Sequence, residues 1–140
     1  MSVPVPGGSI EDWLNELKLY QRNTLNGILL SNEPEKAAEI WITSQGSDII
    51  VHFGGTHDTK PFWDRFRQEF RSFICDDNAY TEEKKALSAE GSITKTLLIS
   101  VVSSAIGATI GYSATLLAPA VAILLCVVGK MTVNAYCKNG

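Results

Sequence analysis

Residues 114–128 read ATLLAPAVAILLCVV, and they lie within a longer segment, 96–129, that contains no charged residue. The hydrocarbon core of a bilayer is about 30 Å thick and takes about 20 residues of helix. A single helix over all 34 uncharged residues would be about 51 Å long, which is too long for one span. Gly111-Tyr112-Ser113 at the centre therefore predicts the turn of a helical transmembrane hairpin, with spans at about 93–110 and 114–137.

Charge divides the chain into two unlike parts. Residues 1–90 carry nine Lys or Arg and all fifteen Asp or Glu, whereas residues 91–140 carry three Lys and no acid. Because positive residues stay on the cytoplasmic side, Lys95 and Lys130 predict a membrane protein with residues 1–90 in the cytoplasm. The acidic balance, without a basic block, excludes a nucleic-acid partner bound through bulk charge.

Small residues recur every fourth position in both predicted membrane helices. Such residues let helices approach closely in lipid, where no hydrophobic force joins them. The rows either close the hairpin within one chain or also join copies into a homo-oligomer, in which three serines would face a pore. The packing residues are Ser103, Gly107, Gly111, Ala118 and Ala122, and the candidate pore-facing residues are Ser100, Ser103 and Ser104.

The preceding part predicts a small α+β domain, mostly helical, with one or two strands. Residues 1–8 are rich in Pro and Gly and indicate a flexible tail, so the domain covers 9–90 and the hairpin region 91–140. The β-branched run 48–53 predicts a strand, whose partner is either 28–30 or another chain. Helices are expected at about 10–23, 33–43, 59–75 and 81–89, with a turn at Asn26-Gly27.

A stripe of four phenylalanines marks the helix expected at 59–75. Phe62, Phe66, Phe70 and Phe73 recur at helical spacing and predict a face packed on the domain core. The alternative is a membrane-surface helix, with its aromatic side chains in the headgroup region and its basic side chains on anionic lipid or a partner. Those basic residues are Lys60, Arg65, Arg67 and Arg71.

No constellation of residues indicates an enzyme. His52, His57, Asp58 and Cys75 lack the spacing of known metal sites, and no phosphate-binding loop or nucleophile motif occurs. We therefore expect no catalytic residue, no metal and no cofactor.

Cysteine usage predicts a reducing compartment. The chain has three cysteines, Cys75, Cys126 and Cys137, and Cys126 lies within the apolar run. This odd, sparse set argues against a disulfide framework, and residues 1–8 lack the basic and apolar blocks of a signal peptide.

The layout resembles the small two-helix membrane effectors of bacterial anti-phage and conflict systems. The residues that carry this resemblance are Ile93–Gly111 and Ala114–Cys137, together with the acidic domain before them. The resemblance implies a protein held inactive by its cytosolic part, a regulatory protein or a small-molecule trigger, whose helices then assemble and breach the membrane.

Three functions follow as expectations. The first is a homo-oligomeric, pore-forming or membrane-disrupting effector, with lipid and further copies of the chain as partners. The second is a binding or adaptor domain that the hairpin only tethers to the membrane. The third is a soluble oligomeric interaction protein with the hairpin buried between protomers, because an all-apolar hairpin in water needs covering on every side.

Overall fold

The computed structural model describes residues 5–52, 60–89 and 93–138, except the side chains of 45–52, 60 and 61. All regular secondary structure in these ranges is helical. In chain order the helices are α1 (Ile10–Leu14), α2 (Leu19–Leu29), α3 (Pro34–His52), α4 (Lys60–Cys75), α5 (Thr81–Ala89), α6 (Lys95–Ile110), α7 (Ala114–Met131) and α8 (Val133–Lys138).

The predicted α+β class is wrong, because the described residues contain no strand. The run expected to form a strand continues α3 as far as His52, and Phe53 lies outside the described residues. Its proposed partner, 28–30, lies at the end of α2. A short apolar run has the same composition in a buried strand and in a buried helix, so its pattern alone does not separate them.

The helix expected at 10–23 is divided into α1 and α2. Ser9 caps α1 through a capping box: the Asp12 N–H donates to Ser9 Oγ (3.3 Å), and the Ser9 N–H donates to Asp12 Oδ2 (3.1 Å). The predicted turn at Asn26-Gly27 is also wrong, because both residues lie within α2.

The remaining helix predictions are closer to the structure. Pro34 begins α3 as expected, although the helix continues past Thr43, and the helices expected at 59–75 and 81–89 are confirmed as α4 and α5. The predicted second hairpin helix is divided into α7 and α8 at Thr132, which has a φ of 96°. This positive φ interrupts the helix because every residue of a right-handed α-helix has a negative φ, about −63°.

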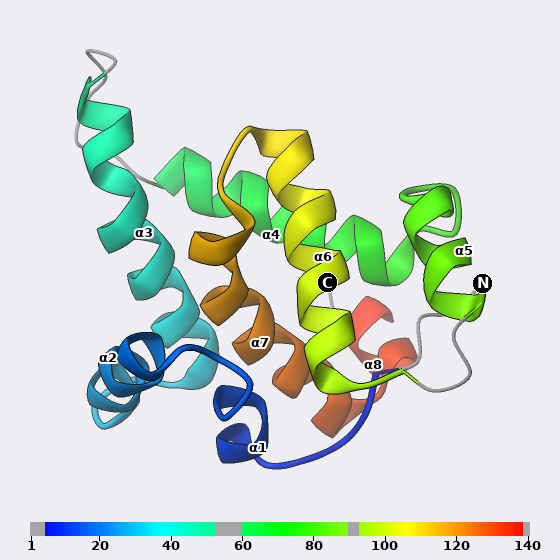
Figure 1. Ribbon diagram of the computed structural model, residues 1–140, viewed down its shortest axis with the longest axis horizontal. Helices are drawn as coiled ribbons and strands as arrows, with labels where there is room; N and C mark the ends of the chain where they lie inside the picture. The colour runs from blue at the N-terminus through cyan, green and yellow to red at the C-terminus, as the bar shows by residue number, and fades with distance from the viewer. Residues whose placement is uncertain (1–4, 53–59, 90–92, 139–140) are drawn as a thin grey trace.

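The core of the bundle is built around α7 (Figure 1). This helix contacts α3 and α6 most extensively and also packs against α1, α2 and α8. Helix α4 lies across the bundle and packs against α3, α6 and α8. The apolar third of the chain is therefore covered by the helices that precede it in sequence.

Helix α4 buries the predicted phenylalanine face. Phe66, Phe70 and Phe73 have no exposed surface, and Trp63 is also buried. Phe62 is half-buried and lies against the Tyr112 ring, with 5.2 Å between ring centroids. The core interpretation of this stripe is confirmed.

Candidate membrane-inserting hairpin

In the described part of the chain, one helix, α7, is long and apolar enough to cross a membrane. The same length and composition also occur in core helices of soluble proteins. Helix α6 is apolar but has 16 residues, fewer than the 17–25 of a typical span. The prediction of two full membrane spans is therefore corrected to one candidate span with a shorter apolar partner.

The central part of α7 is enclosed by the rest of the protein on all its sides. Every residue from Pro119 to Cys126 is buried, which covers more than two helical turns and therefore every face. A helix that is apolar all round is stable only inside a protein or in lipid. In this fold the surrounding helices take the place that lipid would have.

Two polar side chains satisfy the backbone of α7 near Pro119. A proline has no N–H, so the carbonyl four residues earlier, on Thr115, loses its helical donor. The Gln21 side-chain amide donates to this Thr115 oxygen at 2.9 Å, and Trp41 Nε1 donates to the Leu116 oxygen at 2.8 Å. Both side chains are almost fully buried, so α2 and α3 hold α7 by directed hydrogen bonds as well as by packing.

The turn between α6 and α7 is confirmed at Gly111-Tyr112-Ser113. Gly111 adopts the left-handed conformation with a φ of 76°, and the N–H groups of Gly111 and Tyr112 both donate to the Gly107 oxygen, at 2.8 and 2.9 Å. A Cβ on Gly107 would lie 2.5 Å from the Tyr112 oxygen. Gly107 is thus required by the turn of its own chain.

Gly129, near the other end of α7, admits the amino-terminal segment. A Cβ at this position would lie 2.6 Å from the Pro6 oxygen. Nearby, Lys95 Nζ lies over the Trp13 ring, 5.4 Å from its centroid. The amino-terminal residues therefore cover α6 and α7 where the hairpin begins and ends.

The other predicted packing residues differ in how far they are buried within the chain. Ala122 has no exposed surface and Ser103 is 1% exposed, whereas Ala118 is half-buried and Gly111 is exposed. Within the rows of small residues, Gly107 makes a close contact within the hairpin, against the Tyr112 carbonyl oxygen. Whether these rows also join copies of the chain stays a prediction.

The three predicted pore-facing serines line a single groove of about 230 Å³ between α6, α7 and the α1–α2 connection. Ser100 and Ser104 are exposed, and the Ser103 hydroxyl is buried without a hydrogen-bond partner. Thr96 and Gln21 line the same groove. The serines therefore form one polar stripe along α6, facing the amino-terminal helices.

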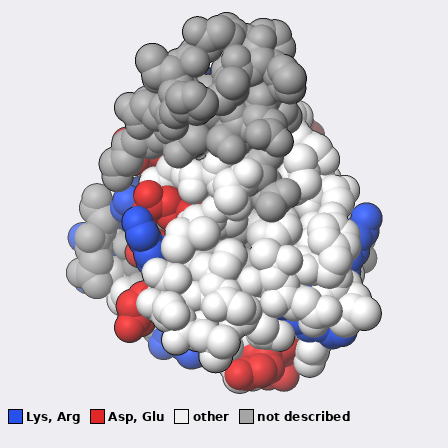
Figure 2. All heavy atoms as spheres, turned by 90° about the vertical axis from the view of Figure 1, so that its left-hand side faces the viewer, with Lys and Arg blue, Asp and Glu red and all other residues white. Residues whose placement is uncertain are grey.

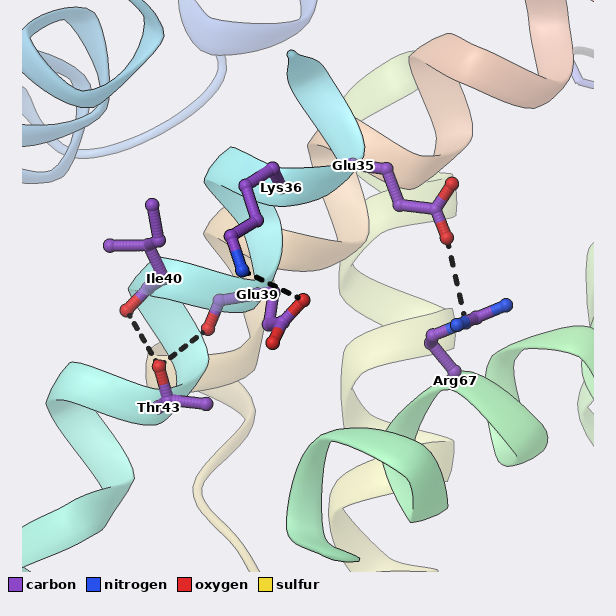
Figure 3. A network of polar contacts seen from close by, with 6 residues as sticks. All are labelled: Glu35, Lys36, Glu39, Ile40, Thr43 and Arg67. Carbon is purple, nitrogen blue, oxygen red and sulfur yellow. Dashed lines mark hydrogen bonds and ion pairs between the residues drawn. The ribbon is translucent and has the colours of Figure 1, made fainter. Parts of the chain in front are cut away.

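Of the three predicted basic side chains that the structure describes, Arg67 and Arg71 lie together and Arg65 is exposed elsewhere on α4. The Lys60 side chain lies outside the described residues. Arg67 Nε lies 3.5 Å from Glu35 Oε1, an ion pair that joins α4 to α3 (Figure 3). Arg67 and Arg71 line one surface cavity together with the acidic residues Glu35 and Asp64. Whether the basic residues of α4 meet anionic lipid or a partner stays a prediction.

Arg71 also belongs to the carboxyl-terminal contact of α8 with α4. Its guanidinium donates to the backbone carbonyl oxygen of Tyr136 at 3.4 Å and to that of Cys137. The same group lies 5.5 Å from the centroid of the Tyr136 ring. Beside this contact lies a surface cavity of about 410 Å³, whose lining includes Glu35, Arg67 and Met131.

A disulfide joins Cys75 at the end of α4 to Cys137 in α8, contrary to the prediction from cysteine usage. The two Cα atoms are 5.7 Å apart, although the residues are 62 positions apart in sequence. Only the tertiary fold brings them together, so their spacing in sequence carried no signal. Cys126 is a free, buried cysteine within α7.

Two further polar contacts lie around the connection between α4 and α5: one links α4 to α6 of the hairpin, and the other links α5 to the end of α4. The Tyr80 hydroxyl donates to Glu69 Oε1 (2.6 Å) and lies 3.0 Å from the Thr109 hydroxyl. The pKa of Tyr80 is raised to about 12, mainly by burial and secondly by the hydrogen bond to Glu69. Lys84 Nζ donates to the backbone carbonyl oxygen of Asp76, just beyond the end of α4. Burial lowers the pKa of Lys84.

A metal site is not formed by the described residues, which contain no cluster of three His, Cys, Asp or Glu side chains. The side chain of His52, and both His57 and Asp58, lie outside the described residues. No protein-family model, curated protein or solved structure matches the chain.

Sequence reasoning missed Gln21, Trp41 and the pairing of Cys75 with Cys137. A signal for Gln21 was present, because Pro119 always leaves a carbonyl that needs a donor. Nothing in the sequence indicated which side chain would supply it.

Proposed function

We propose that this chain is a membrane-inserting, pore-forming effector whose apolar hairpin is stored inside its own helical bundle. The observation that carries the proposal is the burial of α7 on every face from Pro119 to Cys126, in a bundle where it packs against α1, α2, α3, α6 and α8 of the same chain. Storage inside one chain supplies the inactive state that a membrane effector requires, and it needs neither lipid nor a partner protein.

The free energy of α7 is low in two environments, the protein interior and a lipid bilayer, and high in water. Exposing one buried Leu, Ile or Val side chain to water costs about 1.5–3 kcal/mol of free energy. Helix α7 buries Leu117, Val121, Ile123, Leu124, Leu125 and Val128. Transfer from the bundle to a bilayer returns most of that free energy, whereas transfer to water does not, so an opened hairpin inserts into any accessible membrane.

An inserted hairpin presents its polar side chains to other copies. Ser100 and Ser104 lie on the exposed side of α6, and Ser103 has no hydrogen-bond partner in the closed fold. In an assembly of hairpins these hydroxyls supply a wettable surface along a helix that is otherwise apolar. A homo-oligomeric pore is therefore the proposed active form, with residues 1–90 remaining on the side from which the hairpin enters.

Ser113 allows a matched test of insertion. It is the exposed N-cap of α7, and its side chain makes no capping hydrogen bond. Asp and Asn are both good N-caps, so Ser113→Asp and Ser113→Asn are expected to keep the fold. The Asp carboxylate must cross the bilayer with the turn, at about 2.5–3.5 kcal/mol on insertion scales, whereas the Asn amide is uncharged.

The measurement is release of a self-quenching dye from phosphatidylcholine vesicles that contain some phosphatidylglycerol, with gentle warming to populate open conformers. We expect release by the wild type and by Ser113→Asn, and roughly a hundredfold slower release by Ser113→Asp. Equal release by the two variants would contradict insertion of the turn.

The enclosure of α7 also favours one other function, a water-soluble helical interaction module. In that case the wild type stays in the supernatant with vesicles under every condition, and no dye is released. Sedimentation with vesicles after mild warming therefore separates the two functions.

A further inference from the structure

The carboxyl-terminal end of the hairpin is fastened to α4 by a covalent bond. Helix α7 ends at Met131, and α8 begins after Thr132 and carries Cys137, which is bonded to Cys75 at the end of α4. The chain between the two cysteines contains α5, α6 and α7. The disulfide therefore closes a loop around the whole apolar hairpin.

Without the disulfide, α8 has a weak hold on the bundle. It has six residues and none of them is buried. A helix of this length does not persist by itself in water. Its noncovalent contacts to α4 include the Arg71 interactions with Tyr136 and Cys137 and an edge-on packing of Tyr136 against Phe70, with 6.1 Å between ring centroids.

The disulfide also ties the hairpin to a helix that cannot follow it. Phe66, Phe70 and Phe73 anchor α4 in the core, so α4 leaves the bundle only if these rings lose their packing. While Cys137 is bonded to Cys75, the end of α7 can move away from α4 only as far as the six residues from Thr132 to Cys137 reach, about 20 Å. Cleavage of the bond allows α7 to move while α4 stays packed.

We propose that the Cys75–Cys137 disulfide is a redox modification site, cleaved by a dithiol reductant, and that its reduction releases the hairpin. This inference rests on the proposed membrane-inserting function and names its trigger. The two cysteines are half-buried, so a small dithiol or a dithiol protein reaches them at the surface.

The reaction is a two-electron thiol–disulfide exchange. A thiolate of the reductant attacks one sulfur, the S–S bond breaks, and the second thiol of the reductant resolves the mixed disulfide. The products are two cysteine thiols on the protein and a disulfide on the reductant, and the two thiol protons of the reductant end on Cys75 and Cys137.

Amide hydrogen exchange of the full chain, without vesicles, tests the modification site alone. We expect dithiothreitol to speed exchange in α7 and α8 far more than in α4, by up to about a thousandfold, the chain-entropy value for a closed loop of 62 residues. Cys75→Ser/Cys137→Ser is expected to exchange in the same way without reductant. The Cys126→Ala variant, which keeps the disulfide, controls for effects of the reductant on the free thiol.

Vesicle binding then separates this inference from the proposed function. Faster exchange, together with vesicle binding and dye release that dithiothreitol speeds well beyond warming alone, supports both. Faster exchange in α7 without vesicle binding overturns membrane insertion as the function and leaves α7 release by reduction standing. Exchange in α7 that is unchanged by dithiothreitol overturns the redox inference, whatever the vesicles show, and because this uses the wild type, it does not depend on folding of the serine variant.

Discussion

Helices α4 and α7 are both buried in this protein, but in different ways. Helix α4 buries one face, with Phe66 and Phe70 inside and Arg65 and Gln68 outside. Helix α7 is buried on every face from Pro119 to Cys126. The difference shows that an amphipathic helix carries the information about its environment in its own sequence, whereas an apolar helix leaves lipid and protein interior as equal possibilities.

The helices that cover α7, such as α2 and α3, expose apolar residues of their own. Figure 2 shows the face on the side of these helices, where uncharged residues cover most of the described area and charged residues lie near its edges. Leu19 and Leu30 of this region are 61% and 87% exposed. The covering helices thus expose some apolar side chains while they keep α7 away from water.

The largest expected effect comes from placing a carboxylate in each helix. Leu125→Glu puts a charge at a fully buried position of α7, and we expect it to lower the free energy of unfolding by more than about 4 kcal/mol or to prevent folding. Gln68→Glu adds the same group on the exposed face of α4 and should change that free energy by less than about 0.5 kcal/mol. Urea unfolding in detergent-free buffer measures both; a stable, soluble Leu125→Glu protein would contradict the enclosure of α7.

The next effect concerns the turn that leads into α7. Gly107→Ala forces a methyl group against the Tyr112 carbonyl, and we expect a loss of about 1–3 kcal/mol in the free energy of unfolding. Gly27→Ala in α2 is the matched control, because a Cβ there meets no atom within 4 Å. In a helix this control should gain up to about 1 kcal/mol. Thermal unfolding of the two variants should therefore shift in opposite directions.

A smaller, pH-dependent effect is expected where α4 meets the hairpin. The pKa of Tyr80 is raised from 10.0 to about 12, so the fold favours the neutral phenol. Its contribution to stability is complete below pH 10 and is lost as the pH rises toward 12. Tyr80→Phe should show a shallower alkaline loss of stability in unfolding measured by circular dichroism. Some loss should remain, because burial also raises the pKa of Tyr136.

The smallest effect is expected on the exposed side of α4. The Glu35–Arg67 pair has both side chains about half exposed, at 54% and 52%, so solvent screens it. Arg67→Gln should change the free energy of unfolding by less than about 1 kcal/mol. A double-mutant cycle with Glu35→Gln measures the coupling, and a coupling above that value would assign α4 a structural role beyond its buried face.

Several features of the fold and of the candidate site were predictable from local pattern. The start of α3 at Pro34, the phenylalanine face of α4, the bounds of α5 and the turn at Gly111 follow from helix-capping preferences, helical periodicity and the left-handed conformation that glycine adopts. The strand expected at 48–53 was wrong because a short β-branched run has no local feature that separates strand from helix.

The amino-acid sequence by itself determined that the charge-free segment 96–129 would form two apolar helices with a turn at its centre, because backbone hydrogen bonding and side-chain sterics act over a few residues. Only the tertiary structure decided what surrounds those helices. The donors that Gln21 and Trp41 supply to α7 and the pairing of Cys75 with Cys137 join residues distant in sequence. Such contacts depend on how the whole chain packs, and no local pattern encodes them.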